Sequence, residues 1–243
     1  FQKDGRIQIK KGFQIKIIKL TLLNHLFYYT EVSGGSTSAS VTGSFIGDLA
    51  LTYAFNRCLN ENQAMYNFRL KPEYEEIKDF GFYCTVAKPI EKNVGKTENY
   101  IRNTLFNVDG FVDVDRIEKS GKSPFKNFRQ AQGVRLGAEF IALFISRENM
   151  KLPPSIRIGT GKETLVRVEE IDSVINDNDY WLNAYTLKKV FDNLDVAIQV
   201  MMDEKKANFS YVLENYNIIK RFTMDNIHKV FKPVFSDSWI NSQ

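Results

Sequence analysis

A hydrophobic alternation with a period of two runs through the first part of the chain. Ile7 and Ile9 alternate with polar neighbours, and further on Ile18, Leu20 and Leu22 alternate with Ile17, Lys19 and Thr21. Successive side chains of a strand point to opposite faces of a sheet, so this period is typical of strands. The pattern predicts a strand before residue 12 and another that ends near Leu22, an arrangement compatible with a hairpin.

The period changes after a run of small residues. Positions 33 to 55 read SGGSTSASVTGSFIGDLALTYAF, in which glycine and hydroxyl residues give way to an apolar segment. The apolar residues that recur at helical spacing are Ile46, Leu49, Ala50 and Tyr53. We expect these four to form the core side of a helix. A Gly/Ser loop that opens a helix can hold phosphate, because backbone N–H groups at a helix N-terminus attract anions.

Later stretches predict further strands. They are GFYCTVA at 81–87, EFIALFIS at 139–146, and the two alternating runs of SIRIGTGKETLVRVEE at 155–170. The Gly-rich GTGKE between those two runs is typical of a hairpin turn.

The last third of the chain has helical spacing. Apolar residues from Leu187 to Met201 fit a helix, although DNLD at 192–195 could instead separate a turn from a strand. The tail from Asn208 to Pro233 also shows helical spacing, and no internal repeat is present. Strands and helices together predict the α+β class, a mixed sheet that carries helices.

One segment interrupts this order. Between Glu91 and Arg135 the sequence is turn-rich and basic, with too little continuous apolar surface to form a core. We interpret it as an insertion at about 91–135, an extended hairpin that projects from a single domain spanning 1–243.

Composition narrows the class of protein. The chain has 243 residues, of which 43% are hydrophobic, enough to close one core or two small ones. Its 33 basic against 29 acidic residues give a net charge of +4, so attraction to polyanions must come from local clusters. Cys58 and Cys84 stand in apolar surroundings and predict buried thiols in a reducing compartment. No stretch approaches the roughly 20 apolar residues of a membrane helix, and no secretory leader is recognisable, so we expect a soluble, cytoplasmic protein.

Nucleotide hydrolysis finds little support. A Walker loop needs a glycine five residues before its Gly-Lys pair, because several backbone amides must surround the phosphates. The chain's three Gly-Lys pairs, Gly95-Lys96, Gly121-Lys122 and Gly161-Lys162, have Ile90, Arg116 and Ile156 at that position. We interpret them as ordinary turns and expect no cofactor.

Candidates for metal binding or acid–base catalysis are few. Asp113 and Asp115 would share one face of an extended strand, but their turn-rich setting favours solvated acids, so no metal site is expected. The only histidines are His25 and His228. Either could be a general base for RNA cleavage by a 2′-hydroxyl, although His25 beside an apolar strand end is more typical of a partly buried structural residue.

Basic residues interleaved with aromatics are the most informative feature. Within seventeen positions lie Lys119, Lys122, Phe125, Lys126, Phe128, Arg129 and Arg135, and Arg157 with Lys162 forms a second, smaller cluster. Cations pair with phosphates while aromatic rings stack on unpaired bases, the combination that single-stranded RNA recognition uses. A solvated charge run is the alternative.

Four segments together resemble a known family. LTLLNHLFYYTEVSGG, GSFIGDLALTYAF, VRLGAEFIALFIS and PPSIRIGTGKETLVRVEE, in that order, are similar to the Cas-five family subunit of the type I-D CRISPR Cascade complex. Its Ile-Gly-(Asp/Asn)-x-Ala-Leu helix matches residues 46–51. Its late Pro-x-Ile-Arg-Leu-Gly-Lys segment matches residues 154–159, with Ile158 in place of leucine and with Thr160 and Gly161 intervening before Lys162.

The resemblance implies a fold and a role. The fold is a ferredoxin-like (RRM-like) core with an inserted thumb-like hairpin. The role is non-catalytic: the subunit holds the 5′ handle of the guide RNA (crRNA) and caps the backbone filament in antiviral defence. Its partners would be the backbone subunit, the large subunit and, through the assembled complex, target DNA near the protospacer-adjacent motif. On this interpretation the residues at 33–44 form a surface connection near RNA or a neighbouring subunit.

Two alternatives stay open. One is a metal-independent endoribonuclease of the same superfamily that uses His25 to process the guide RNA. The other is a viral or mobile-element module that uses a ferredoxin-like fold to bind another protein and has no affinity for RNA.

Overall fold

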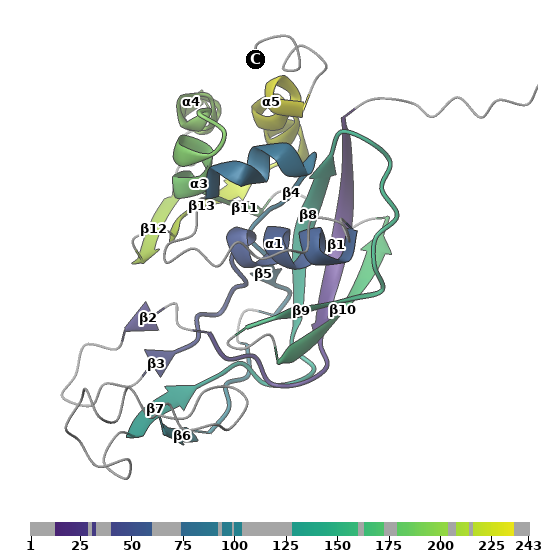
Figure 1. Ribbon diagram of the computed structural model, residues 1–243. Helices are drawn as coiled ribbons and strands as arrows, with labels where there is room; N and C mark the ends of the chain where they lie inside the picture. Colours follow the sequence, from purple (N-terminus) through teal and green to yellow (C-terminus); the bar gives the residue numbers. More distant parts are fainter. Residues whose placement is uncertain are drawn as a thin grey trace, which may run out of the picture.

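A curved antiparallel sheet, called here the main sheet, forms the centre of the protein (Figure 1). The computed structural model describes residues 13–28, 31–32, 40–59, 74–91, 94–98, 100–103, 128–159, 163–172, 179–203, 208–213 and 216–235. The strands are β1 (Gln14–Leu22), β4 (Phe82–Cys84), β5 (Lys88–Pro89), β8 (Glu139–Ser146), β9 (Ser155–Ile158) and β10 (Thr164–Ile171). Their order is β4-β8-β1-β10-β9, with β5 also paired to β8, and every pairing is antiparallel.

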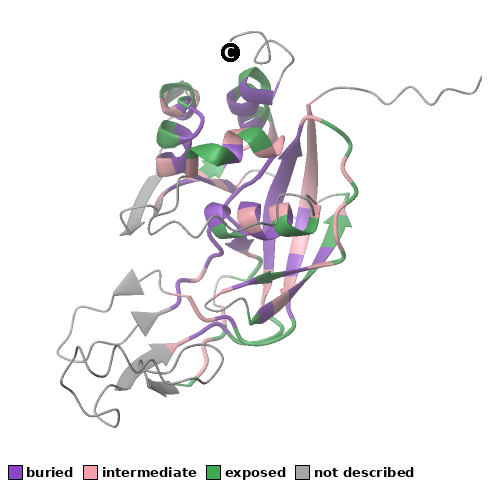
Figure 2. Ribbon diagram, viewed as in Figure 1, coloured by how far each residue is buried: buried purple, intermediate pink, exposed green. Residues whose placement is uncertain are grey.

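Both faces of the main sheet are buried at its centre, as Figure 2 shows for β8. Along β8, Phe140, Ala142 and Phe144 join one core cluster, whereas Ile141, Leu143 and Ile145 join another. In β1 the predicted residues Ile18, Leu20 and Leu22 are buried. The predicted strand before residue 12 lies outside the described residues.

Helix α1 (Asp48–Leu59) covers one face of the main sheet. Leu51 and Phe55 are fully buried, and the Phe55 ring lies 5.2 Å from that of Phe144. The helix was predicted, but its inward side was partly wrong: Ala50 is exposed and Ile46 precedes the helix. A 3-10 helix (Tyr74–Phe80) follows α1 along the chain.

Residues 179–235, called here the C-terminal layer, cover much of the other face. They form β11 (Tyr180–Asn183), α3 (Ala184–Lys189), α4 (Leu194–Asp203), β12 (Asn208–Leu213), β13 (Tyr216–Phe222) and α5 (Met224–Phe235). The strand order is β11-β13-β12, again antiparallel. The helix expected between Leu187 and Met201 is two short helices, and the helical interpretation of 208–222 was wrong, since this stretch is a hairpin.

A small third sheet contains the strands of the predicted insertion. It is built from β2 (Glu31–Val32), β3 (Ser40–Val41), β6 (Tyr100–Asn103) and β7 (Phe128–Gln132), in the order β2-β3-β7-β6. The β6–β7 pair is antiparallel, whereas β3 pairs with β7 in parallel. Residues 104–127 lie outside the described ranges.

Asp48, the first residue of α1, is fully buried between the main sheet and the C-terminal layer. Its carboxylate accepts hydrogen bonds from Tyr83 Oη (2.9 Å), Asn183 Nδ2 (2.9 Å) and Thr186 Oγ1 (2.5 Å). Burial raises the pKa of the Asp48 carboxyl, and the three hydrogen bonds oppose the rise. Because Tyr83 lies on β4 while Asn183 caps α3, this one side chain joins the two layers.

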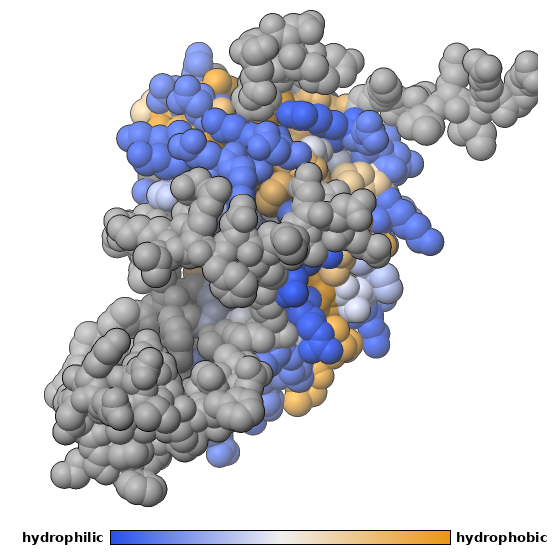
Figure 3. Space-filling model, viewed as in Figure 1, coloured by the Kyte–Doolittle hydropathy of each residue, from blue (hydrophilic) through white to orange (hydrophobic). Residues whose placement is uncertain are grey.

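One of the two cysteines predicted to be buried is exposed. Cys84 is buried as expected, but Cys58 is exposed at the end of α1. Hydrophilic residues cover much of the described surface in the upper half of Figure 3. No helix within the described ranges has the length and apolar character needed to cross a membrane.

Candidate nucleic-acid interface

Three segments meet beyond the end of β1. Leu26 exchanges backbone hydrogen bonds with Val134 (3.0 and 2.9 Å), and Thr164 Oγ1 donates to the carbonyl oxygen of His25 (2.9 Å). Residues 133–135 lie at the end of the predicted insertion, whereas Thr164 belongs to the Gly-rich hairpin. Two segments singled out in the sequence therefore lie on either side of residues 25–27.

Glycine is required on both sides of this meeting point. A Cβ added to Gly133 would lie 2.6 Å from the carbonyl oxygen of Leu26, too close for any side chain. Gly159 has φ +84° and a Cβ there would lie 3.1 Å from the carbonyl oxygen of Phe27. The first glycine of the hairpin thus provides both a left-handed turn and a close backbone approach.

Two of the predicted RNA-binding residues extend from these segments. Arg135 is exposed two residues after Gly133, and its backbone N–H donates to the carbonyl oxygen of Gly95 (2.8 Å). Arg157 is exposed two residues before Gly159, on β9. Both arginines therefore flank the meeting point.

Arg157 has a basic neighbour that sequence reasoning missed. It pairs with Leu165, and Arg167 pairs with Ser155, so the two arginines are diagonal neighbours on adjacent strands. Both are exposed on the face of the sheet that α1 does not cover, because the intervening Ile156 packs in the cluster under that helix.

The other predicted RNA-binding residues lie on β7 or outside the described ranges. Phe128 and Arg129 open β7, where they pair with Asn103 and Arg102. Lys122, Lys126 and Lys162 lie outside the described residues, as do the predicted solvated acids Asp113 and Asp115. Within the described ranges, no group of three or more His, Cys, Asp or Glu side chains could hold a metal ion.

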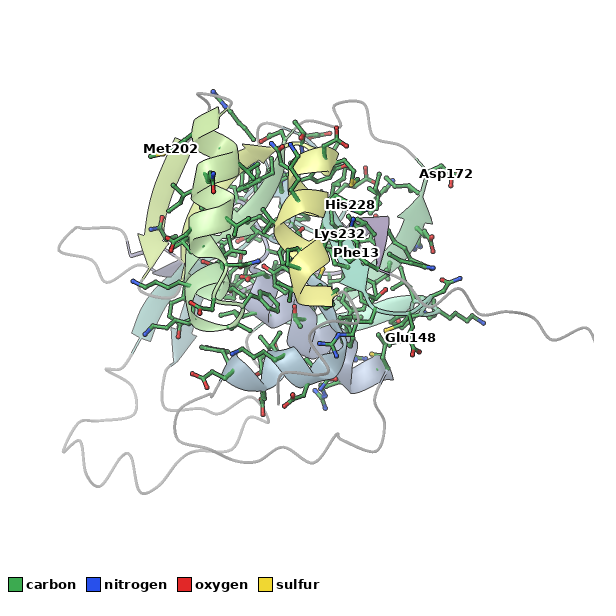
Figure 4. All side chains as sticks on the ribbon, turned by 90° about the horizontal axis from the view of Figure 1, so that it is seen from above. Phe13, Glu148, Asp172, Met202, His228 and Lys232 are labelled. Atoms are coloured by element: carbon green, nitrogen blue, oxygen red, sulfur yellow. The ribbon has the colours of Figure 1, made fainter. Side chains whose placement is uncertain are left out.

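The two histidines are placed far apart. His25 follows the end of β1 and is exposed rather than partly buried, and its Nδ1 accepts the backbone N–H of Leu136 (3.1 Å). His228 on α5 lies beside Phe13 at the start of β1, with ring centroids 4.7 Å apart (Figure 4). The nine residues of β1 span about 30 Å, so the two imidazoles cannot act as an acid–base pair.

His228 also borders a pocket. Its lining consists of Ile15, Lys16, Ile17, Glu170, Ile171, Asp172, Met224 and His228. The Lys16 ammonium lies 2.9 Å from the Glu170 carboxylate, so the main cation there is already paired. The pocket lining also includes the acidic residues Glu170 and Asp172, which do not favour the binding of a phosphate.

A second aromatic and basic group lies in the C-terminal layer, where sequence reasoning did not look. The Lys220 ammonium is 4.2 Å from the centroid of the Trp181 ring, a cation–π contact between β13 and β11. The next residue, Arg221, is exposed and has φ +72°, a conformation that costs a non-glycine residue about 1 kcal/mol or more. The adjacent Lys-Arg pair was the available signal, but interpreting this stretch as helix hid its pairing with Trp181.

Taken together, the chain is an α+β protein with an antiparallel main sheet, and Arg135 and Arg157 are exposed near the glycines at residues 133 and 159. It belongs to the family of type I-D CRISPR-associated proteins Cas5/Csc1, whose model matches residues 13–233. Among solved structures, the chain is similar to one in the cryo-EM structure of the type III-B Cmr-beta complex bound to cognate target RNA and AMPPnP. That match has 9% identity and a TM-score of 0.37, and it covers 86% of this chain and 84% of the other. No curated protein matches the sequence.

Proposed function

We propose that the protein is a non-catalytic guide-RNA-binding subunit of a type I-D CRISPR Cascade complex, which holds the 5′ handle and caps the backbone filament. Membership of the Cas5/Csc1 family over residues 13–233 is the observation that carries this proposal. It also favours a CRISPR role over a viral or mobile-element module. The partners would be the backbone and large subunits in the cytoplasm, and target DNA near the protospacer-adjacent motif.

The strand order supports a ferredoxin-like core. In that plan two βαβ halves interleave, so that the first strand lies at the centre of an antiparallel sheet. Here β1 lies between β8 and β10, and α1 connects β1 toward β4 at the far side of β8. The described residues between β8 and β10 contain β9 in place of a second helix. We propose a single domain with this core, in which residues 91–135 form the thumb-like insertion.

The RNA site we propose surrounds residues 25–27. Its cations and ring are Lys122, Lys126, Phe128, Arg129 and Arg135 from the insertion and Arg157 with Lys162 from the Gly-rich hairpin. Arg135 and Arg157, one on each side, could contact successive phosphates of a strand that crosses the glycines. Gly133 and Gly159 let both segments approach the main chain of Leu26 and Phe27 closely, which brings the two arginines to the same part of the molecule.

The geometry of His25 argues against the endoribonuclease alternative. Since its Nδ1 already accepts the Leu136 N–H, the proton of the neutral ring resides on Nε2, and no free lone pair is left to take a proton from a 2′-hydroxyl. We therefore propose that His25 positions the turn at residues 135–138 rather than acting in catalysis.

Incubation of the purified protein with its repeat RNA tests this function. We expect a gel shift at nanomolar to micromolar protein and intact RNA, with or without divalent metal. Specific cleavage that is lost in His25→Ala would overturn the non-catalytic role. His228→Ala serves as the matched histidine control. Absence of any shift would overturn RNA binding and favour the protein-binding alternative.

A further inference from the structure

A bulge places two cations opposite Trp181. In the pairing of β11 with β13, Tyr180 pairs with Phe222 and Leu182 pairs with Ile219. Between these pairs Trp181 alone faces two residues, Lys220 and Arg221. Bulges of this kind redirect side chains and are common beside binding sites.

The Trp181 ring and the bulge are held by one carboxylate. Asp179 Oδ1 accepts hydrogen bonds from Trp181 Nε1 and from the backbone N–H of Arg221, both at 3.0 Å. The Lys88 ammonium lies 3.5 Å from Asp179 Oδ2 and balances its charge. The indole thus has a fixed orientation, and its only polar group is already satisfied.

The strained backbone of Arg221 is a second feature typical of a binding site. Its φ of +72° is one that glycine would adopt without cost, yet the position carries an exposed arginine. Residues kept in such conformations cluster at binding sites, where the surrounding contacts over-determine them. Neither Lys220 nor Arg221 forms an ion pair with any described residue, so both charges are available to a ligand.

The surroundings of the ring fit a flat partner. Trp181 is half-buried and packs against the small cluster of Phe45, Val86 and Ile218. Bases of single strands stack on such anchored rings, while adjacent cations contact the phosphates. In the sequence, Phe45 directly follows the Gly/Ser-rich stretch at 33–44.

We propose that Trp181, Lys220 and Arg221 form a binding site for one unpaired nucleotide of a single-stranded nucleic acid. The base stacks on Trp181 in place of the Lys220 ammonium, and the two cations contact its phosphates. The proposal rests on the nucleic-acid-binding function above, but it places a contact in the C-terminal layer, away from the predicted cluster. The strand is either the guide RNA or the target DNA, which share this chemistry.

Tryptophan fluorescence tests the contact directly. The sequence has two tryptophans, so Trp239→Phe in the full chain leaves Trp181 as the sole indole. This variant is titrated with single-stranded repeat RNA, with DNA of the same sequence, and with an oligonucleotide of abasic sites, while binding is followed in parallel by anisotropy of a labelled strand. We expect quenching by a strand that carries bases and none by the abasic strand.

The outcomes separate the two proposals. Quenching by RNA assigns the site to the guide, and quenching by DNA alone assigns it to the target strand. RNA binding with no quenching by either strand overturns the Trp181 site and leaves the proposed function intact. If neither strand binds, both proposals are wrong.

Variants distinguish stacking from packing. Trp181→Leu keeps an apolar side chain against Val86 but removes the aromatic face, so affinity should fall about tenfold, whereas Trp181→Phe should stay within about threefold of wild type. Arg221→Gly should raise the melting temperature, because glycine adopts φ +72° without strain, and yet weaken binding several-fold. A more stable Arg221→Gly protein with unchanged affinity would contradict the site, and Lys189→Gly on α3 controls for loss of an exposed cation.

Discussion

The main sheet and the C-terminal layer hold their basic residues in different ways. On the main-sheet side, Arg135 and Arg157 extend from exposed positions beside glycine-bounded loops. In the C-terminal layer, Lys220 and Arg221 are placed by a bulge beside the fixed ring of Trp181. Long exposed side chains supply charge without fixed geometry, whereas an anchored ring supplies shape. We therefore expect the first region to give salt-dependent affinity and the second to give base stacking.

Helix α1 packs against both regions. Leu49 and Asp48, neighbours at the start of α1, both lie against the C-terminal layer, whereas Leu51 and Phe55 pack under the main sheet. Helix α1 thus belongs to both cores. Changes at its first turn should separate the layers without touching either candidate RNA contact.

Leu49→Asp should have the largest effect. Leu49 is 3% exposed, and an aspartate there would bury a charge with no partner provided for it. We expect the free energy of unfolding to fall by about 3 to 5 kcal/mol, measured by urea denaturation. Ala50→Asp is the control, because Ala50 is exposed one residue further along the same helix. A loss of less than about 1 kcal/mol in Leu49→Asp would show that α1 does not join the layers.

Asp48→Ala should have the second largest effect. We expect it to lower the free energy of unfolding by about 2 to 4 kcal/mol. It would leave buried donors on Tyr83, Asn183 and Thr186 without their acceptor, and each such orphan costs about 1 kcal/mol or more. Relief of the cost of burying a carboxyl offsets part of this loss. If Asp48→Ala and wild type were equally stable, the energy gained by no longer burying a carboxyl would equal the energy lost with the three hydrogen bonds.

The pH dependence of the stability contributed by Asp48 has a definite sign. Since burial raises the pKa of the Asp48 carboxyl, the folded state binds more protons than the unfolded state above the ordinary pKa of about 4. The contribution of this group to stability should therefore be largest at or below pH 4 and decline as pH rises through the folded pKa. Urea denaturation from pH 3.5 to 7 should show the stability of wild type relative to Asp48→Asn decreasing with pH. A relative stability that increases with pH would mean that the hydrogen bonds, not burial, dominate.

The contrast between the regions also explains what the sequence could predict. In the main sheet, strands such as β8 are buried on both faces, so EFIALFIS is an unbroken apolar run that only a central strand fits. In β13, Ile218 and Ile219 are both buried but on opposite sides of one strand, in different clusters. Two adjacent apolar residues followed by Phe222 mimic helical spacing, which is why the hairpin was missed. The pairing of β13 with β11 and β12, rather than its local hydrophobic pattern, makes this segment a strand.

The candidate site follows the same rule. Arg135 and Arg157 were predictable because each stands beside glycines that mark loops in the sequence. Trp181 and its two cations were not, because they become neighbours only through the β11–β13 pairing and its bulge. Likewise, Asp48 belonged to a recognised motif, yet its partners Asn183 and Thr186 lie more than 130 residues away along the chain.

A charge-reversal pair sharpens the comparison between the regions for RNA binding. Replacing Lys122, Lys126, Arg129 and Arg135 by Glu changes the net charge from +4 to −4. The control replaces Lys188, Lys189, Lys229 and Lys232, four exposed residues of the C-terminal layer, with the same change in charge. If the first set contacts phosphates, its slope of log K against log salt should fall by about 0.7 per contact, whereas the control should keep the wild-type slope.

Circular dichroism and melting should stay near wild type in both charge-reversal proteins. Phe128→Ala, in contrast, should weaken binding through lost stacking with little change in the salt slope. Equal losses of affinity in the two charge-reversal proteins would mean that RNA responds to net charge alone. If instead the first protein keeps the wild-type affinity and salt slope, the basic insertion is a solvated loop, and the contacts must be sought at Arg157 and Lys162.

The smallest effect concerns two glycines that differ in a single respect. Gly159 and Gly137 both have positive φ (+84° and +80°), so alanine at either position carries the same backbone strain of about 1 kcal/mol. A Cβ at Gly137 would meet nothing within 4 Å, whereas one at Gly159 would lie 3.1 Å from the carbonyl oxygen of Phe27. Gly159→Ala should therefore destabilise the fold by a few tenths of a kcal/mol to about 1 kcal/mol more than Gly137→Ala. It should also weaken RNA binding, because residues 25–27 would be pushed away from the hairpin that carries Arg157. Thermal melting and anisotropy of both variants measure this difference, and identical behaviour of the two would show that the close approach at Gly159 is not needed to shape the interface.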